Sequence, residues 1–349
     1  MKVGILTGGG DCPGLNAVIR AIVRKGILNY GYAVLGIYKG WKGLIDEDLI
    51  KPLSLGDVSG ILHRGGTILR SSRTNPFKVE NGVELIKSNL KRHDINALIA
   101  IGGEDTLGVA AKLHEQGINV VGVPKTIDND VMGTERTFGF DTALNVATEA
   151  IDRVHTTAEA HNRVMVVEVM GRHAGWIAIE SGIAGGADMI LFPEKITYVD
   201  EICELLKRRH SRGKDFSIVV VAEGAKLKLS KESNVEEEVT QDQKLDAFGH
   251  VRLGGIGNKL ADLIEDGTGY ETRAIILGYI QRGGTPTAYD RVLATRFGVH
   301  AIDYVRQGKF GQMVSLNGNK IVAFPLSKVV AKTKTVDEEM IETAEVFFG

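Results

Sequence analysis

Residues 124–130 gather the side chains of this chain that are best suited to chemistry. The segment reads Pro-Lys-Thr-Ile-Asp-Asn-Asp and directly follows an apolar run at residues 119–123. Such a run predicts a buried strand, and doubly wound α/β proteins bind their ligands at the carboxyl ends of strands. A carboxylate there can take a proton from a hydroxyl, and an ammonium can neutralise phosphate oxygens. The segment therefore indicates phosphoryl transfer to an alcohol.

Two glycine-rich turns, at residues 8–11 and 102–105, each lie between a predicted strand and a predicted helix. Such turns leave free backbone amides at the start of a helix, where anions bind. Glu104, in the second turn, can contact a hydrated magnesium ion, which prefers one or two carboxylates together with phosphate oxygens. The alternative is structural: the glycines form tight turns only, and Glu104 or Asp105 caps the following helix.

A sugar-phosphate ligand is indicated by polar side chains near other glycine turns and strand ends. Guanidinium groups bind phosphate oxygens with a planar fork, and a carboxylate can accept hydrogen bonds from sugar hydroxyls. The alternatives are solvated surface arginines and a carboxylate that only caps a turn. The residues concerned are Arg64, Arg73, Glu223, Arg273, Tyr279 and Arg282.

Apolar runs of strand length alternate with longer amphipathic patterns, which predicts βαβ units and a mainly parallel sheet. The predicted strands are residues 3–7, 33–38, 97–101, 120–123, 163–169, 189–192, 217–222 and 272–277. The predicted helices include residues 15–29, 107–115, 144–158 and 199–209. A length of 349 residues favours two domains. The polar segment 226–246 is interpreted as an exposed insertion.

The overall composition excludes several classes of protein. Charged residues make up 25% and hydrophobic ones 43%, an ordinary globular mixture, and the net charge of −2 gives no basic footprint for a nucleic-acid partner. No apolar run is long enough for a membrane partner, and the first residues predict a strand rather than a signal peptide. Cys12 and Cys203 lie far apart, which predicts free thiols in a reducing compartment. We therefore expect a cytoplasmic protein.

Five motifs together resemble the 6-phosphofructokinases, and they follow the family's order over about the first 310 residues. They are Gly-Gly-Asp-x-Pro-Gly-x-Asn at 9–16, Arg-Gly-Gly-Thr at 64–67, the segment 124–130, Glu-Val-Met-Gly-Arg at 168–172 and Gly-x-Ile-Gln-Arg-Gly-Gly at 278–284. The resemblance implies two Rossmann-like three-layer α/β/α domains with mainly parallel sheets and the active site in the cleft between them. It also implies a homodimer or homotetramer whose active sites are shared across an interface.

The resemblance assigns a role to each part of the chain. A phosphoryl-donor-binding domain spans residues 1–139, and residues 281–325 return to it. A sugar-phosphate-binding domain spans residues 140–280, and residues 326–349 form a C-terminal tail without candidate site residues.

Individual site residues carry over by motif position. Asp128 resembles the base that deprotonates the 1-hydroxyl of fructose 6-phosphate, Thr126 and Asp130 belong to the same turn, and Arg172 would stabilise charge on the transferring phosphoryl group. The implied donor-binding residues are Gly10, Arg73, Gly103, Asp105 and Lys125. The implied substrate-binding residues are Thr126, Asp128, Arg163, Met170, Gly171, Arg172, Glu223, Arg273, Tyr279 and Arg282, of which Arg163 and Arg273 would come from a neighbouring subunit. Mg2+ is the implied cofactor, with Glu104 as its contact.

Two positions differ from the common bacterial ATP-dependent pattern, which has glycine where Asp105 and Lys125 stand. An aspartate places volume and negative charge where a nucleotide's α-phosphate and adenosine would need room. The lysine can pair with a donor phosphate instead. The pair resembles the pyrophosphate-dependent members of the family, so pyrophosphate is the expected donor. ATP is the alternative donor, and a non-catalytic sugar-phosphate sensor is the remote alternative.

Overall fold

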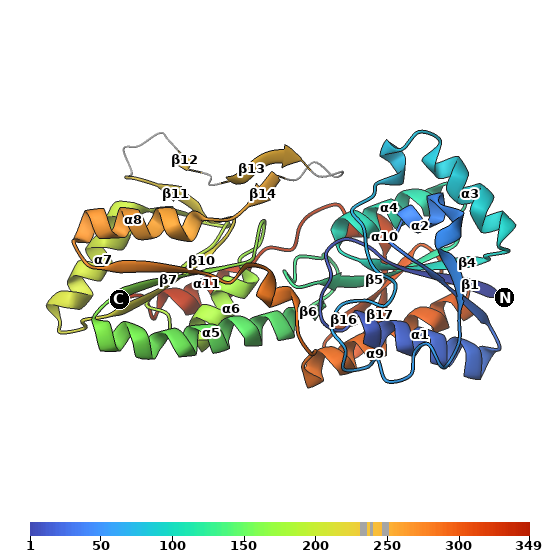
Figure 1. Cartoon of the computed structure of the whole chain (residues 1–349), viewed down its shortest axis with the longest axis horizontal. Helices are drawn as coiled ribbons and strands as arrows, with labels where there is room; N and C mark the ends of the chain where they lie inside the picture. Colours follow the sequence, from blue (N-terminus) through green and yellow to red (C-terminus); the bar gives the residue numbers. More distant parts are fainter. Residues whose placement is uncertain (231–235, 238–239, 246–250) are drawn as a thin grey trace. The chain divides into compact units, whose positions relative to one another are not determined.

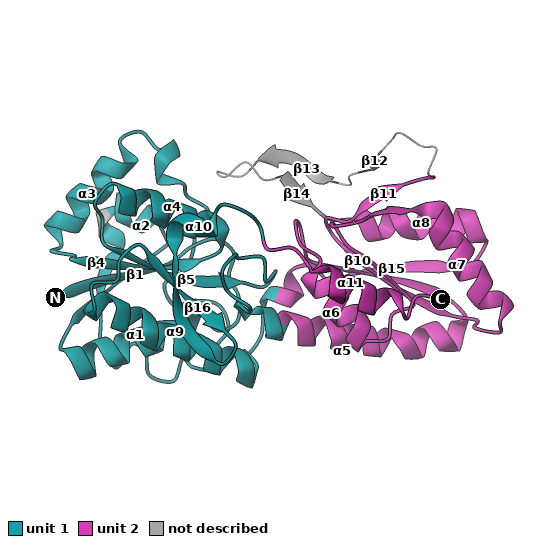
Figure 2. Cartoon of the chain, turned by 180° about the vertical axis from the view of Figure 1, so that it is seen from behind, with its two compact units in different colours: residues 1–142, 246–250, 282–333 teal, residues 143–245, 251–281, 334–349 magenta. Residues whose placement is uncertain are grey.

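A computed structural model describes residues 1–230, 236–237, 240–245 and 251–349 of the chain. The described residues divide into two compact units (Figure 2). Unit 1 comprises Met1–Thr142 and Arg282–Thr333, and unit 2 comprises the described parts of Ala143–Leu245 together with Val251–Gln281 and Lys334–Gly349. Within the described residues, the chain passes between the units after Thr142, after Gln281 and after Thr333, and the expected domain bounds and tail stay predictions.

Unit 1 is built on a mainly parallel sheet with the order β17-β16-β5-β4-β1-β2-β3 (Figure 1). Its strands are β1 (Lys2–Thr7), β2 (Ala33–Ile37), β3 (Ile50–Leu53), β4 (Ala97–Gly102), β5 (Val120–Thr126), β16 (Gln312–Asn317) and β17 (Lys320–Pro325), and the short β6 (Phe138–Gly139) pairs with the end of β5. The edge strands β3 and β17 are antiparallel to their neighbours. β4 and β5 are buried along their whole length, as expected for parallel strands covered on both faces.

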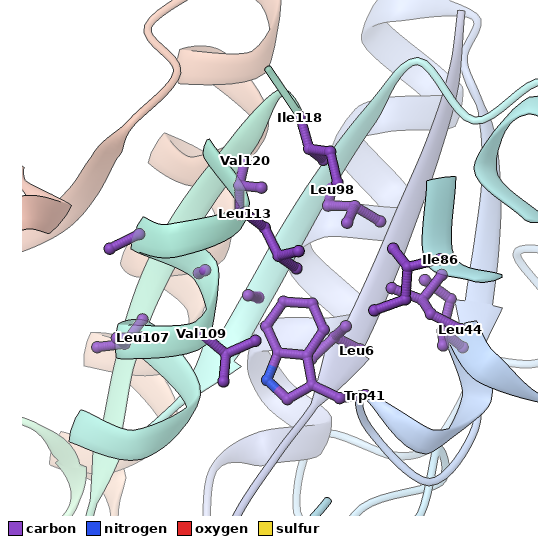
Figure 3. Packing of buried hydrophobic residues seen from close by; sticks show 14 of the residues in the cluster. Leu6, Trp41, Leu44, Ile86, Leu98, Leu107, Val109, Leu113, Ile118 and Val120 are labelled. Carbon is purple, nitrogen blue, oxygen red and sulfur yellow. The ribbon is translucent and has the colours of Figure 1, made fainter. Parts of the chain in front are cut away.

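Helices cover both faces of this sheet, so unit 1 has three layers (Figure 1). α1 (Leu15–Tyr30) and α9 (Ala288–Arg306) lie on one face, and α2 (Lys42–Ile45), α3 (Gly82–Arg92), α4 (Glu104–Glu115) and α10 (Leu326–Val329) lie on the other. Two 3-10 turns, Glu47–Leu49 and Pro76–Lys78, complete the unit. Figure 3 shows the ring of Trp41 among Leu6, Val109 and Leu113 in the core beneath the second group of helices.

Unit 2 repeats the three-layer arrangement around a parallel sheet with the order β15-β7-β10-β8. Its strands are β7 (Val164–Val169), β8 (Met189–Leu191), β10 (Ser217–Ala222) and β15 (Thr272–Ile276), and its helices are α5 (Phe140–His161, which begins in unit 1), α6 (Trp176–Ala184), α7 (Val199–Ser211), α8 (Ile256–Thr268) and α11 (Glu338–Glu345). The 3-10 helix η3 (Gly278–Arg282) follows β15. Short strands β9 (Ile196–Tyr198), β11 (Lys226–Lys228) and β12 (Glu236–Glu237) form one small sheet, and β13 (Thr240–Leu245) and β14 (Val251–Leu253) another.

All eight predicted strands and all four named helices are confirmed, and so is the expected α/β fold class with mainly parallel sheets. Of the interpreted insertion at 226–246, residues 231–235, 238–239 and 246 lie outside the described residues. In the part of the chain that the structure describes, none of the helices is long and apolar enough to cross a membrane.

The strand order places a topological switch point between β1 and β4. β1 is hydrogen-bonded to both β2 and β4, and the chain builds β2 on one side of β1 and then β4 and β5 on the other. Loops that leave neighbouring strands at such a point diverge, and the crevice outside the carboxyl ends of the strands is where open α/β sheets bind ligands. The candidate site of unit 1 lies at these strand ends.

Candidate active site

The two glycine-rich turns meet at the switch point. The backbone amide of Gly8 donates to the carbonyl of Ile101 across a distance of 2.9 Å, which joins the ends of β1 and β4. Gly9 has a φ of 76°, a left-handed conformation that favours glycine. Gly103 is the N-cap residue of α4 and carries no side chain with which to cap the helix itself. The N-terminus of α4, with its backbone amides, therefore lies at this turn, and a helix N-terminus is suited to phosphate.

A third loop packs against the first turn. Ser71 Oγ donates to the carbonyl of Gly9 at 2.5 Å, and the amide of Gly9 donates to the carbonyl of Ser72 at 3.3 Å. These bonds hold the exposed Arg73 next to the turn. Asn16 fixes the preceding part of the loop, because its Nδ2 donates to the carbonyl of Arg64 at 3.0 Å and its Oδ1 accepts from Ile68 N at 2.8 Å.

Lys125 and Arg282 bring positive charge to the same turn. Lys125 is buried, and its Nζ donates to the carbonyl of Gly10. Arg282 Nη1 donates to the carbonyl of Asp11 at 3.4 Å. Burial lowers the pKa of Lys125, the Arg282 charge lowers it further, and the nearby thiol of Cys12 opposes this. An anion bound at this turn would stabilise both cations.

Hydrogen bonds between side chains and backbone groups fix the segment that contains Asp128. Asp128 N donates to Thr126 Oγ1 at 3.1 Å, and Thr137 Oγ1 donates to the carbonyl of Thr126 at 2.8 Å. Thr137 N in turn donates to Asn129 Oδ1 at 3.1 Å. Asp128 itself is half-buried, and within the described residues its Oδ1 is buried without a hydrogen-bond partner. A carboxylate oxygen without a partner can accept a proton from a hydroxyl that comes within hydrogen-bond reach.

Three carboxylates share this end of the sheet. The pKa of Asp130 is raised to about 7, first by burial and then by the negative charges of Asp128 and Glu104. Glu104 Oε2 accepts a hydrogen bond of 3.3 Å from Thr333 Oγ1. Within the described residues, no group of three or more His, Cys, Asp or Glu side chains is arranged to hold a metal ion by itself. The cluster fits magnesium nonetheless, because this ion takes few protein carboxylates, completes its shell with water and phosphate oxygens, and would offset the charge that raises the pKa of Asp130.

In unit 2, most of the predicted sugar-phosphate residues follow the carboxyl ends of the parallel strands. Met170, Gly171 and Arg172 follow β7, Glu223 follows β10 and Tyr279 follows β15. Backbone bonds join these ends, since Glu223 N donates to the carbonyl of Val169 at 2.8 Å and Gly224 N to that of Gly171 at 3.1 Å. The structure therefore brings this group of residues together at the carboxyl ends of the strands of this sheet.

Arg163 and Arg273 lie at the amino ends of strands in the same sheet, opposite the carboxyl ends described above. Arg163 directly precedes β7 and Arg273 is near the start of β15. Both guanidinium groups contact the carboxylate of Glu271, with N–O distances of 2.8 and 2.7 Å. β7 has six residues, so its amino and carboxyl ends lie about 20 Å apart. The arginine pair therefore does not join Arg172 within one chain.

Some residues of the site region were not singled out from the sequence. Gln281 is fully buried and accepts from Met170 N at 3.3 Å, which ties η3 to the end of β7. Glu168 is buried and accepts from Gly255 N and Gly257 N at the start of α8. Gln281 and Glu168 belong to two of the family motifs, and this could have marked them as candidate site residues. Thr333 lies in a segment without any motif, so the sequence gave no indication of its position beside Glu104.

Comparison with known proteins identifies the family of this chain. The family model for phosphofructokinase matches residues 2–305. The chain belongs to the phosphofructokinase family.

Relatives within the family carry names with either donor. A pyrophosphate–fructose 6-phosphate 1-phosphotransferase of Amycolatopsis mediterranei is 61% identical over 350 residues, which covers 100% of both chains. An ATP-dependent 6-phosphofructokinase 2 of Streptomyces coelicolor is 51% identical over 351 residues, again covering 100% of both. Among solved structures, phosphofructokinase from Saccharomyces cerevisiae superposes with a TM-score of 0.82 at 32% identity, covering 99% of this chain and 50% of the yeast chain.

Proposed function

We propose that this chain is a diphosphate–fructose-6-phosphate 1-phosphotransferase. It transfers a phosphoryl group from pyrophosphate to the 1-hydroxyl of fructose 6-phosphate and gives fructose 1,6-bisphosphate and phosphate. The observation that carries the proposal is the position of Asp128, whose buried Oδ1 lies at the end of β5 beside an anion-binding turn with a buried lysine. The name of the Amycolatopsis relative describes the same activity.

The base chemistry follows from the turn that holds Asp128. The carboxylate takes the proton of the 1-hydroxyl, the resulting oxygen forms a bond to the terminal phosphorus of pyrophosphate, and the bridging P–O bond breaks as phosphate leaves. Thr126 fixes the turn through its hydroxyl and its carbonyl. Asp130, whose pKa is raised by burial, lies nearby as a second carboxyl of the turn.

Pyrophosphate as donor is supported by charge and space around α4. Amides near Gly10 and Gly103 and the side chains of Arg73 and Lys125 are suited to four closely spaced phosphate charges. Asp105 occupies the first turn of α4, where its volume and negative charge oppose the α-phosphate and adenosine of a longer donor. The ATP-named relative at 51% identity makes ATP the second candidate donor.

Magnesium is proposed as the cofactor, with Glu104 as its protein contact beside Asp128 and Asp130. When bound, the ion would neutralise phosphate oxygens of the donor. The protein's own contribution is to hold Glu104 and the Asp128 turn on neighbouring strands of one sheet. A role in glycolysis follows from the product, fructose 1,6-bisphosphate, and the free, buried thiols of Cys12 and Cys203 support a cytoplasmic location.

We further propose that unit 1 binds the phosphoryl donor and unit 2 the sugar phosphate. Met170, Gly171, Arg172, Glu223 and Tyr279 would contact fructose 6-phosphate, and Arg172 would also stabilise the transferring phosphoryl group. Arg163 and Arg273 lie at the amino ends of the strands of unit 2, away from these residues. They would therefore contribute to the site of a second copy, in a homodimer or homotetramer. Arg282, also assigned to the sugar phosphate, lies on the donor turn, and its role stays a prediction.

Initial rates with purified protein, magnesium and fructose 6-phosphate test the proposal, with pyrophosphate and ATP compared as donors. Turnover with pyrophosphate alone is the expected result. Turnover with ATP alone would support the same phosphoryl transfer to fructose 6-phosphate but refute pyrophosphate as its donor. Binding of fructose 6-phosphate without turnover by either donor would favour the sugar-phosphate sensor instead.

A further inference from the structure

The segment from Leu326 to Thr333 packs along α4, the helix that begins at the donor turn. Figure 1 shows α10 next to α4 on the same face of the sheet. Leu326 and Val329 are each 1% exposed and belong to one hydrophobic cluster with Leu107 and Val109 of α4. The segment is therefore anchored in the core of unit 1.

Two residues of this segment contact the accessible face of α4. Thr333 Oγ1 donates to Glu104 Oε2 at 3.3 Å, and a Cβ built on Gly108 would lie 3.0 Å from Val330 Cγ1. Glu104 and Gly108 are four residues apart, so they share one face of the helix. The segment thus runs back along this face toward the N-terminus of α4.

A donor that binds at the N-terminus of α4 and is longer than pyrophosphate would extend along this face under our proposal. In the first turns of α4, Thr106 and Leu107 are buried, and Glu104, Asp105 and Gly108 are the partly exposed positions. Pyrophosphate ends at its second phosphate, whereas a nucleoside triphosphate continues with a third phosphate, a ribose and a base. Those groups would meet two carboxylates and then the Val330 side chain, which fills the space that a glycine would otherwise leave open.

We propose that residues 326–333 are a donor-selecting element, in which Val330 closes the α4 face to nucleosides and Thr333 positions Glu104. The inference rests on the proposed function, because it assumes that pyrophosphate binds at the N-terminus of α4. It adds to the charge of Asp105 a steric barrier from a distant part of the chain. Thr333 acts through Glu104 and is a positioning residue.

The selecting role is tested by binding of a fluorescent N-methylanthraniloyl derivative of ADP. Asp105→Gly is compared with the double variant Asp105→Gly/Val330→Ala, and Val346→Ala in the same background is the matched control because Val346 is an exposed valine of α11's end. Opening the α4 face should tighten the nucleotide by about tenfold or more, the scale at which pocket methyl groups discriminate. Equal affinities in all three proteins would overturn this role of Val330.

The positioning role is tested by Thr333→Val, which removes the hydroxyl and keeps the shape. Calorimetric binding of pyrophosphate should weaken by about tenfold in the presence of magnesium, the effect of one hydrogen bond to a charged group. Thr333→Ser should restore most of the affinity, and the KM for fructose 6-phosphate should not change. Thr343→Val is the control, because the Thr343 hydroxyl donates within α11 to Glu339 O. Unchanged pyrophosphate binding in Thr333→Val would overturn this role.

The same experiments separate the inference from the proposed function. If the wild-type protein does not use pyrophosphate at all, the proposed function fails first, and initial rates show this before any variant is made. If the wild type uses pyrophosphate and both variants behave like their controls, only the donor-selecting element is refuted. Melting temperatures of all variants identify any that fail to fold.

Discussion

Asp128 and Asp130 are two residues apart and have different surroundings. Asp128 is half-buried, and among the residues that the structure describes its Oδ1 has no hydrogen-bond partner, which leaves this oxygen able to accept a proton. The pKa of Asp130 is raised to about 7, mainly by burial and then by the Asp128 charge. Under the proposed function Asp128 would accept the proton of the substrate hydroxyl, and Asp130 would be the second carboxyl of the turn, more readily protonated because it is buried.

Replacing Asp128 with Ser should lower kcat by about 10²- to 10⁴-fold, because base catalysis contributes a factor of this size. The KM values for fructose 6-phosphate and pyrophosphate should change little, since the backbone turn keeps its bonds to Thr126 and Thr137. Steady-state kinetics measure both parameters. Asp152→Ser, at an exposed position of α5, is the matched control. Unchanged turnover in Asp128→Ser would remove this residue from the chemistry.

The raised pKa of Asp130 predicts a pH-dependent stability. A carboxyl whose pKa rises from 3.8 to about 7 holds its proton more tightly in the folded chain than in the unfolded one. Its stabilising contribution is complete below a pH of about 4 and is lost as the pH rises toward about 7. Asn at this position does not titrate, so the melting temperature of Asp130→Asn should rise relative to wild type across this range. Calorimetry at several pH values checks this, and a difference that does not vary with pH would contradict it.

At the scale of elements, continuous apolar runs made the central strands predictable. β4, β7 and β10 are buried along their whole length, and helices cover both faces of their sheets. The turn with Asp128 could be predicted in the same way, because its polar residues directly follow such a strand. β16, β17 and α10 were not predicted, since their place depends on partners far away in the sequence. For the same reason, no local pattern could reveal the contact of Thr333 with Glu104.

Glu168 shows that a motif position can serve an element rather than the chemistry. Its carboxylate accepts from Gly255 N at 3.0 Å and from Gly257 N at 2.8 Å, which satisfies amides at the start of α8. Glu168→Ala should destabilise the protein by about 1–3 kcal/mol, since buried donors lose their partner. Glu168→Gln, which keeps an acceptor oxygen, should lose less. Denaturant unfolding measures both, and equal stability of Glu168→Ala and wild type would refute the cap.

Across the whole molecule, the arginines of unit 2 lie at opposite ends of the strands of one sheet. Arg172 follows the end of β7, whereas Arg163 precedes its start and shares Glu271 with Arg273. A chain that uses all three on one substrate needs a second copy to supply the distant pair. The proposed assignment of all three arginines to one substrate therefore predicts an oligomer.

Mixing two impaired variants, with rates measured at fructose 6-phosphate concentrations well below KM, tests this prediction. Asp128→Ser lacks the base, and Arg163→Ala should raise the KM for fructose 6-phosphate by about tenfold or more through loss of a phosphate contact. In mixed oligomers, some sites combine an intact Asp128 with an Arg163 from the other variant. Denaturing and refolding the two together should therefore restore activity above the sum of the separate proteins. No gain in a mixture shown to contain hybrids would mean that each chain is self-sufficient.

The alternation of the chain between the two units has a consequence for its synthesis on the ribosome. β5 pairs with β16, and α1 packs on α9, but β16 and α9 belong to the returning segment Arg282–Thr333. All the residues of unit 2 up to Gln281 are translated before that segment. At ordinary elongation rates, the outer edge of β5 stays without β16 for roughly 10–40 s. An open strand edge can pair with other chains, so the nascent protein is open to mispairing at β5 until translation is almost finished.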